Sequence, residues 1–134
     1  MNELEHKVRE YLSRPQRYWD DEEPKDIYGI AALPIFSAAF DRESDPTRRA
    51  YITRIVWRYR DIAALPTLAK AIRDGNEAVW KDAVDGLVYV GGESALRILR
   101  DSLEDVAMLP DAANRQEWIE EAITQIGEGQ FPRG

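Results

Sequence analysis

A short helical phrase returns at a nearly constant interval along this chain. Residues 32–36 read ALPIF, residues 64–68 read ALPTL, and residues 95–99 read ALRIL. Each copy is followed by a polar break and then by a second segment with apolar residues at helical spacing. A period of about 30 to 45 residues with two helices in each unit is typical of stacked helical repeats. The spacing therefore predicts an all-helical fold built from stacked hairpins.

Length and composition indicate the class of protein. The 134 residues match one domain of ordinary size, and 44% apolar residues are enough for a packed core. There is no cysteine, which excludes disulfides, cysteine metal sites and thiol chemistry. The first residues lack an apolar stretch behind a basic head, and no run approaches the roughly 18 apolar residues of a membrane helix. We expect a soluble cytoplasmic protein.

The formal charge of −7 bears on the kind of partner. A net negative protein repels the phosphate backbone of nucleic acids and the surface of anionic membranes, and it favours a basic partner. The charges are unevenly distributed, because residues 20–23 form the acidic run DDEE whereas residues 48–60 are rich in arginine. We predict another protein, basic in character, as the partner, with no nucleic acid and no membrane involved.

Apolar residues at helical spacing predict a series of helices along the chain. We place them at residues 3–13, 24–40, 46–59, 62–74, 77–90, 94–106 and 113–126. Pro15 should end the first helix, because the residue before a proline is pushed out of the helical region. Gly91 and Gly92 should end the helix at 77–90. Pro34 and Pro66 interrupt helical patterns, so we expect a kink or a fresh helix start at each.

Residues 64–83, ALPTLAKAIRDGNEAVWKDA, resemble a bacterial HEAT-like repeat. In that pattern an apolar helix meets an Asp-Gly/Asn turn and then a second helix with small residues at its close contacts. The resemblance covers about residues 31–128. It implies an all-α fold, a short right-handed α-solenoid of about three HEAT-like hairpins with an extra N-terminal helix. The single domain, residues 1–134, would comprise the N-terminal helix at 3–13 and repeats at about 27–60, 62–91 and 94–127.

The second helices of HEAT-like stacks usually line a concave surface. If Val79, Ala83, Leu87 and Val90 face the core, the residues between them turn outward. The outward positions and their equivalents in the other two units are Lys81, Asp82, Asp85, Tyr89, Arg49, Ala50, Thr53, Trp57, Glu117, Trp118, Glu121 and Gln125. These positions predict a groove that combines aromatic and acidic side chains.

Aromatic side chains surrounded by charge are the usual anchors of protein interfaces. We therefore predict six partner-binding residues in the groove: Trp57, Asp82, Asp85, Tyr89, Trp118 and Glu121. The alternative is that Trp57 and Trp118 pack between neighbouring helices, because a short stack has few other places for large rings.

The acidic run offers a second candidate site. Trp19, Asp20 and Asp21 could dock on a basic protein, or they could belong to a solvated linker with Trp19 lying over the first repeat. The arginines of the basic segment could bind phosphate or an acidic partner. Alternatively they pair with neighbouring carboxylates, such as Asp82, Asp85 or the acidic run; the residues concerned are Arg48, Arg49, Arg54 and Arg58.

No enzymatic motif stands out. His6 is the only histidine, so a histidine metal pair cannot form, and we recognise no Ser-His-Asp set. Asp82 and Asp85 share a helix face, but general acid–base chemistry needs a buried carboxyl with a perturbed pKa. We take such pairs as surface charges, and we expect no metal, no cofactor and no catalytic residue.

These features predict a non-enzymatic protein-binding module whose acidic, aromatic-lined face binds a basic partner. A small, acidic protein of this kind resembles the immunity proteins with which bacteria neutralise toxins, and an adaptor role fits the same residues. The alternative is a HEAT-like enzyme. Trp57, Asp85 and Trp118 could line a DNA glycosylase-like cleft, although the charge does not suit duplex DNA. The repeat alone would also fit a phycobilin lyase-like protein.

Overall fold

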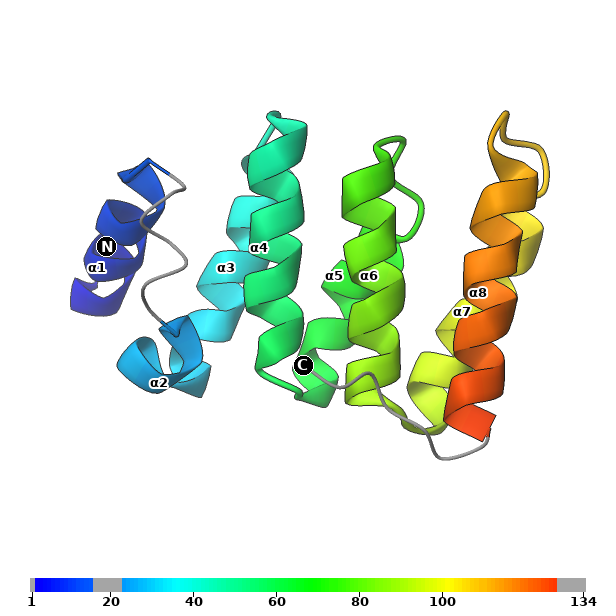
Figure 1. The fold of residues 1–134 in the computed structure, drawn as a ribbon. Coiled ribbons are helices and arrows are strands. Elements are labelled where there is room, and N and C mark those ends of the chain that lie inside the picture. The colour runs from blue at the N-terminus through cyan, green and yellow to red at the C-terminus, as the bar shows by residue number, and fades with distance from the viewer. Residues whose placement is uncertain (1, 16–22, 128–134) are drawn as a thin grey trace.

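The backbone is helical, as the repeats predict. A computed structural model of this chain describes residues 2–15 and 23–127, and the regular structure within those ranges is entirely helical (Figure 1). The elements are α1 (Glu3–Ser13), α2 (Pro24–Tyr28), η2 (Ile30–Ala32), α3 (Leu33–Arg42), α4 (Pro46–Arg58), η3 (Ile62–Ala64), α5 (Leu65–Ala71), α6 (Glu77–Val90), α7 (Gly92–Val106) and α8 (Ala112–Gly127). The all-α class is confirmed. None of these described helices is both long enough and apolar enough to cross a membrane.

Side-chain caps explain where three of the helices begin. Asn2, Asp45 and Asn76 each accept a backbone N–H from the first turn of α1, α4 and α6, at 2.8, 2.9 and 3.0 Å. Such caps satisfy N–H groups that have no partner inside the helix. The predicted bounds of α1 and α6 are confirmed. α4, predicted to reach Tyr59, ends one residue earlier, at Arg58.

One pentapeptide, IAALP, occurs at residues 30–34 and again at residues 62–66, and it forms the same structure twice. Each copy begins with a 3-10 turn, η2 or η3, and continues into an α-helix whose first turn contains the proline. Proline suits this position because its φ is already helical and an N–H there would have no partner in the helix. Pro34 and Pro66 therefore start new helices, which confirms one of the two expected outcomes.

The prediction of one continuous helix over residues 24–40 is wrong, because the helix is interrupted at Gly29. The chain leaves helical geometry at Gly29, whose φ of 71° lies in the left-handed region that glycine adopts at no steric cost. Gly29 ends α2 by donating its N–H to the carbonyl oxygen of Lys25 at 3.2 Å. The apolar periodicity continues across the break, so the pattern alone does not reveal it.

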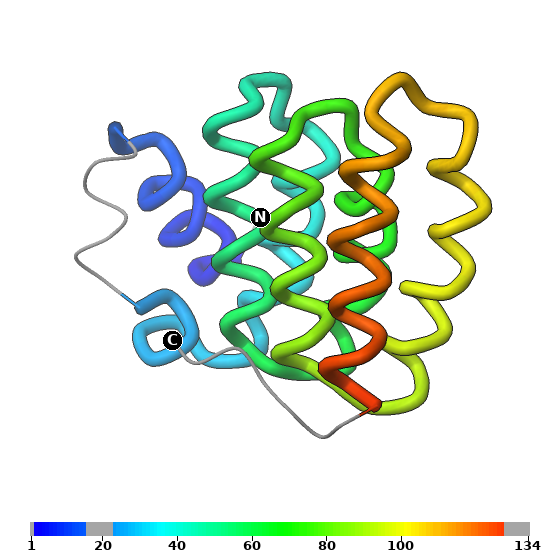
Figure 2. The backbone as a smooth tube through the Cα atoms, turned by 45° about the vertical axis from the view of Figure 1, so that its right-hand side comes forward, coloured from blue at the N-terminus to red at the C-terminus, as the bar shows by residue number. Residues whose placement is uncertain are grey.

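The helices form two layers (Figures 1 and 2). α4, α6 and α8 lie side by side in one layer, α3, α5 and α7 lie behind them, and α1 and α2 lie at the N-terminal end. Consecutive helices pack in pairs, α3 with α4, α5 with α6, and α7 with α8. Buried apolar side chains from both layers form one core, among them Phe36, Leu68, Leu87, Leu99 and Ile119.

Three arginines, which we call the arginine caps, bind the carboxyl-terminal ends of three helices. Arg48, Arg49 and Arg115 each donate to two backbone carbonyls in or just beyond a last helical turn. The acceptors are Leu12 O and Arg14 O at α1, Phe40 O and Glu43 O at α3, and Ile72 O and Asp74 O at α5. Such carbonyls carry the negative end of the helix dipole, which favours a cation beside them.

Candidate functional site

The layer of α4, α6 and α8 contains the predicted binding residues, and we call its outer side the α4–α6–α8 face. Two of the positions predicted to point outward, Ala50 and Thr53, are buried instead. α4 packs closely along α6, so small side chains on that flank are enclosed. The Thr53 hydroxyl donates to the carbonyl oxygen of Arg49 at 2.8 Å, and it therefore needs no water.

An aromatic stack joins α4 to α6. The rings of Trp57 and Tyr89 are nearly parallel, at 20°, with their centroids 4.5 Å apart, and both side chains are half-buried. Gly86 makes room for this contact, because a Cβ at that position would lie 2.6 Å from Trp57 Cβ. Trp57 thus packs between neighbouring helices while part of its surface stays accessible.

The surroundings of this stack are basic. A hollow of about 260 Å³ beside it is lined by Glu23, Lys25, Trp57, Arg58, Arg60 and Tyr89. The Arg60 guanidinium lies 5.4 Å from the centre of the Tyr89 ring, a cation–π distance. Arg58 pairs with Glu23 at 3.2 Å, as one interpretation of the arginine cluster predicts. Three cations and one carboxylate therefore line the end of the face where acidic neighbours were predicted.

Asp82 forms an ion pair with Arg54 within the protein. Its carboxylate accepts from Arg54 Nε at 3.3 Å, and only 11% of its side chain is exposed. Burial raises the pKa of Asp82, and the Arg54 guanidinium opposes that increase. The pairing of an arginine with Asp82 was one of the two interpretations drawn from the sequence. Asp82 consequently offers a partner less surface than the predicted anchor role requires.

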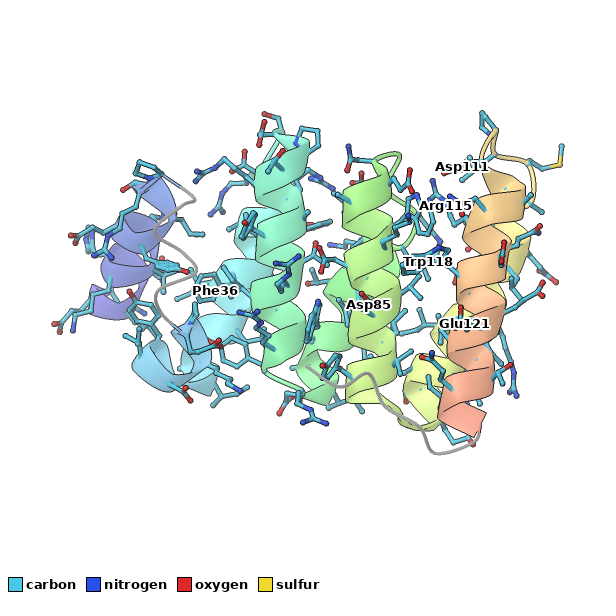
Figure 3. All side chains as sticks on the ribbon, in the orientation of Figure 1. Phe36, Asp85, Asp111, Arg115, Trp118 and Glu121 are labelled. Atoms are coloured by element: carbon cyan, nitrogen blue, oxygen red, sulfur yellow. The ribbon has the colours of Figure 1, made fainter. Side chains whose placement is uncertain are left out.

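A second hollow, which we call the α6–α8 pocket, has a volume of about 210 Å³. It brings together three predicted binding residues from two helices, Asp85, Trp118 and Glu121; the other lining residues are Val84, Val88, Ala122 and Gln125. Figure 3 shows Trp118 between α6 and α8. The Trp118 ring packs edge-on against the buried Trp80 ring, with centroids 6.0 Å apart, and remains partly exposed. One wall of the pocket is thus apolar and aromatic, and its rim is acidic.

The carboxyl group of Asp85 is the unusual feature of this pocket. It is half-buried and makes no hydrogen bond or ion pair with any residue that the structure describes. Burial raises the pKa of Asp85 from 3.8 to about 6, the neighbouring Asp82 carboxylate adds to the increase, and Arg54 reduces it. The pocket therefore contains a carboxylate that a bound cation would stabilise.

Replacing Asp85 with asparagine should stabilise the protein at neutral pH. Below pH 3.8 the carboxyl is protonated in the folded and the unfolded chain alike. Between pH 3.8 and about 6 the carboxyl ionises in the unfolded chain but stays largely protonated in the folded one. The wild type therefore loses stability as the pH rises through this range. Solvent screening at this half-buried position limits the gain for Asp85→Asn to about 1 kcal/mol.

Urea unfolding of the wild type and of Asp85→Asn, at about pH 4 and about pH 7.5, measures this effect. The two proteins should differ little at the lower pH and separate at the higher one. A variant that is less stable than the wild type at about pH 7.5 would contradict the raised pKa of Asp85.

The structure divides the predicted groove into two parts. Trp57 and Tyr89 form the basic part between α4 and α6, while Asp85, Trp118 and Glu121 form the acidic part between α6 and α8. Trp19, Asp20 and Asp21 lie outside the described residues. Sequence analysis did not identify Lys25 and Arg60 as neighbours of the stack, and no periodic signal marks either one. It also overlooked Gly86, although a glycine inside a helical pattern is a recognised sign of close packing.

The described ranges, residues 2–15 and 23–127, contain no group of three His, Cys, Asp or Glu side chains that could hold a metal ion. No protein-family model, no curated protein and no solved structure matches the chain. The two hollows on the α4–α6–α8 face and the charges around them are therefore the basis for a functional assignment.

Proposed function

We propose that the protein is a non-enzymatic protein-binding module whose α6–α8 pocket receives a basic side chain of the partner. The geometry of the pocket is the observation that supports this assignment. Asp85 on α6 and Glu121 on α8 contribute carboxylates from opposite sides, and Trp118 supplies an aromatic wall. A lysine or arginine head would pair with the carboxylates, while its aliphatic stem would pack on the partly exposed ring of Trp118.

We further propose that the helix pairs are HEAT-like repeats in a short right-handed solenoid. The identical structure of the two IAALP segments and the common layer of α4, α6 and α8 support this proposal. Solenoids of stacked helical pairs use the surface lined by equivalent helices for extended contacts. The α4–α6–α8 face is that surface in this chain.

The partner that suits the face is a basic protein, such as a toxin domain that this chain would neutralise or a target that it would recruit as an adaptor. A net charge of −7 accelerates encounter with a basic protein. The basic hollow beside Trp57 and Tyr89 adds one requirement, namely an acidic or polar group on the partner at that end of the interface. The two hollows together would fix the orientation of the complex.

Affinity capture from cells of the host, with matched variants as bait, tests this proposal. The binding variant is Asp85→Asn/Glu121→Gln, and the control is Asp101→Asn/Glu104→Gln on exposed positions of α7, which removes the same charge. We expect one stoichiometric basic protein that binds the wild type and the control, dissociates as salt rises, and binds the first variant at least about tenfold more weakly. A partner held equally well by both variants would place the interface elsewhere.

A glycosylase-like enzyme is the alternative, and one observation favours it. The raised pKa of Asp85, beside the partly exposed Trp118, suits a carboxyl that takes part in acid–base chemistry. Trp57, however, stacks on Tyr89 in the other hollow and does not line the Asp85 pocket. Retention of duplex DNA by the purified protein at about 0.1 M salt, with release of a modified base, would support the enzyme.

A further inference from the structure

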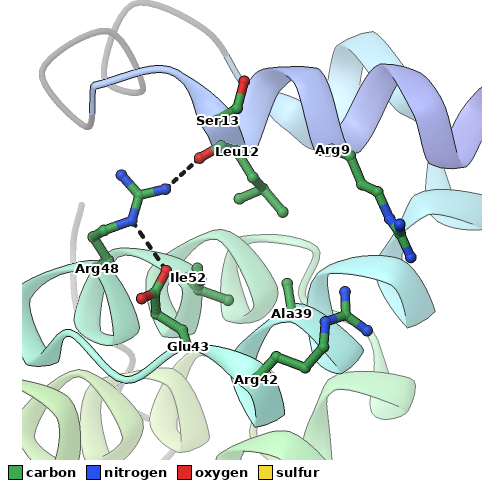
Figure 4. Close-up of a pocket in the computed structure, with 8 residues that line it drawn as sticks. All are labelled: Arg9, Leu12, Ser13, Ala39, Arg42, Glu43, Arg48 and Ile52. Atoms are coloured by element: carbon green, nitrogen blue, oxygen red, sulfur yellow. Dashed lines mark hydrogen bonds and ion pairs between the residues drawn. The ribbon is translucent and has the colours of Figure 1, made fainter.

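A third cavity lies at the N-terminal end of the molecule, away from the α6–α8 pocket. This cleft between α1 and the α3–α4 pair has a volume of about 490 Å³, which is the size of a small-molecule site (Figure 4). Its lining residues are Arg9, Leu12, Ser13, Ala39, Arg42, Glu43, Arg48 and Ile52. None of them belongs to the two hollows on the α4–α6–α8 face.

Two cations converge on this cleft. Arg9 on α1 and Arg42 on α3 are exposed and extend toward each other from opposite sides. Within the described part of the chain, neither guanidinium has an ion-pair or hydrogen-bond partner. Two like charges that face one opening repel each other, and an anion between them would remove that repulsion.

The other described charges do not neutralise the two arginines. Among the residues that the structure describes, Glu43 is the only carboxylate that lines the cleft, and it accepts from Arg48 Nε at 3.0 Å. Arg48 itself is fixed by that ion pair and by the carbonyls at the end of α1. The described lining of the cleft therefore carries an excess of positive charge, in a chain whose formal charge is −7.

Apart from Ser13, whose hydroxyl donates to the carbonyl oxygen of Glu10 at 2.7 Å, the rest of the lining is apolar. Leu12, Ala39 and Ile52 contribute alkyl groups beside the two guanidinium groups. A guanidinium presents two parallel N–H donors that match the oxygens of a carboxylate or a phosphate. Cations adjoining an apolar wall fit a ligand with an anionic head and an apolar body.

We infer that the cleft between α1 and α3 binds a small amphiphilic oxyanion. Its carboxylate or phosphate group lies between Arg9 and Arg42, and its apolar part lies against Leu12, Ala39 and Ile52. This site is separate from the proposed protein-binding face, since the two share no residue. Failure of one proposal therefore leaves the other intact.

An NMR titration of the full chain with phenyl phosphate tests the inference. We expect saturable shifts of the Ala39 and Ile52 methyl signals, and an affinity at least about tenfold lower in Arg9→Gln and in Arg42→Gln. The control is Arg97→Gln, at an exposed position on α7, which should bind as the wild type does. A parallel titration with benzoate shows whether a carboxylate or a phosphate is the preferred head group.

Two further probes separate the contributions of the anion and of the apolar body. Benzyl alcohol has the ring without the charge, and inorganic phosphate has the charge without the ring, so each should bind more weakly than phenyl phosphate. Equal binding of benzyl alcohol would overturn the role of the arginines, and equal binding of inorganic phosphate would overturn the role of the apolar wall. The absence of saturation up to about 10 mM phenyl phosphate, a free energy of only about 3 kcal/mol, would overturn the site itself.

Discussion

Replacing Arg115 with methionine is expected to destabilise the protein by about 3 kcal/mol or more. The Arg115 side chain is buried, and it donates to the carbonyl oxygens of Ile72 at 3.1 Å and Asp74 at 2.8 Å. Its guanidinium also lies 5.0 Å from the centre of the Trp80 ring. Methionine keeps the volume of the stem but leaves those carbonyls without a donor. Chemical unfolding followed by circular dichroism measures the loss.

Asp111→Asn is the matched control for Arg115→Met. Asp111 accepts from Arg115 at 2.8 Å, and that hydrogen bond lowers the pKa of Asp111. The Asp111 side chain is more than one third exposed, so solvent screens the pair and its removal should cost less than about 1 kcal/mol. If both substitutions cost the same, the carbonyl contacts of Arg115 would contribute nothing beyond its ion pair.

Gly86→Ala is expected to destabilise the protein by about 2 kcal/mol, although alanine is the better helix former by about 1 kcal/mol. The new methyl group would lie 2.6 Å from both Cβ and Cγ of Trp57, where the α4–α6 contact is tight. Because the backbone fixes the position of Trp57 Cβ, relief requires α4 and α6 to move apart, and that movement disturbs the stack of Trp57 on Tyr89. Unfolding measurements give the stability, and near-ultraviolet circular dichroism reports the loss of the stack.

A double-mutant cycle with Trp57→Gly, which removes the Cβ of residue 57 together with the indole, isolates the cause of that effect. Without any side chain at residue 57, Gly86→Ala should become neutral or stabilising by up to about 1 kcal/mol, because only the helix propensity of alanine remains. Gly75→Ala is a control, since a Cβ at Gly75 would meet no atom within 4 Å. A loss at Gly86 that persists in the Trp57→Gly background would mean that the clash is with another group.

Much of the fold was predictable because its signals are local. The bounds of α1 and α6 follow from nearby caps and from residues that stop a helix, Asn2, Asn76 and Gly91. The break at Gly29 was missed because the apolar pattern runs through it, whereas backbone conformation at a glycine is free to change. The burial of Thr53 was missed for a different reason. It depends on how closely α6 approaches α4, and that distance is set by tertiary packing.

For the candidate site, the sequence predicted the acidic part of the face but not the basic part. Asp85, Trp118 and Glu121 share a pocket because helical spacing places them on facing flanks of α6 and α8. The cations around Trp57 and Tyr89 were not anticipated there. Lys25 comes from α2, more than 30 residues earlier in the chain than Trp57, and Arg60 follows the end of α4. Sequence spacing within one helix carries no information about such contacts.

The arginine caps have a consequence for how the protein unfolds. Arg115 belongs to α8, in the last hairpin, yet the carbonyls that it binds follow α5, in the hairpin before. Arg49 on α4 likewise pairs with Asp74, in the loop of the next hairpin, at 2.7 Å. Unfolding of one of these hairpins therefore breaks hydrogen bonds or an ion pair near the helix ends of its neighbour. These shared bonds therefore add to the packing between adjacent helix pairs, and they favour a cooperative loss of structure.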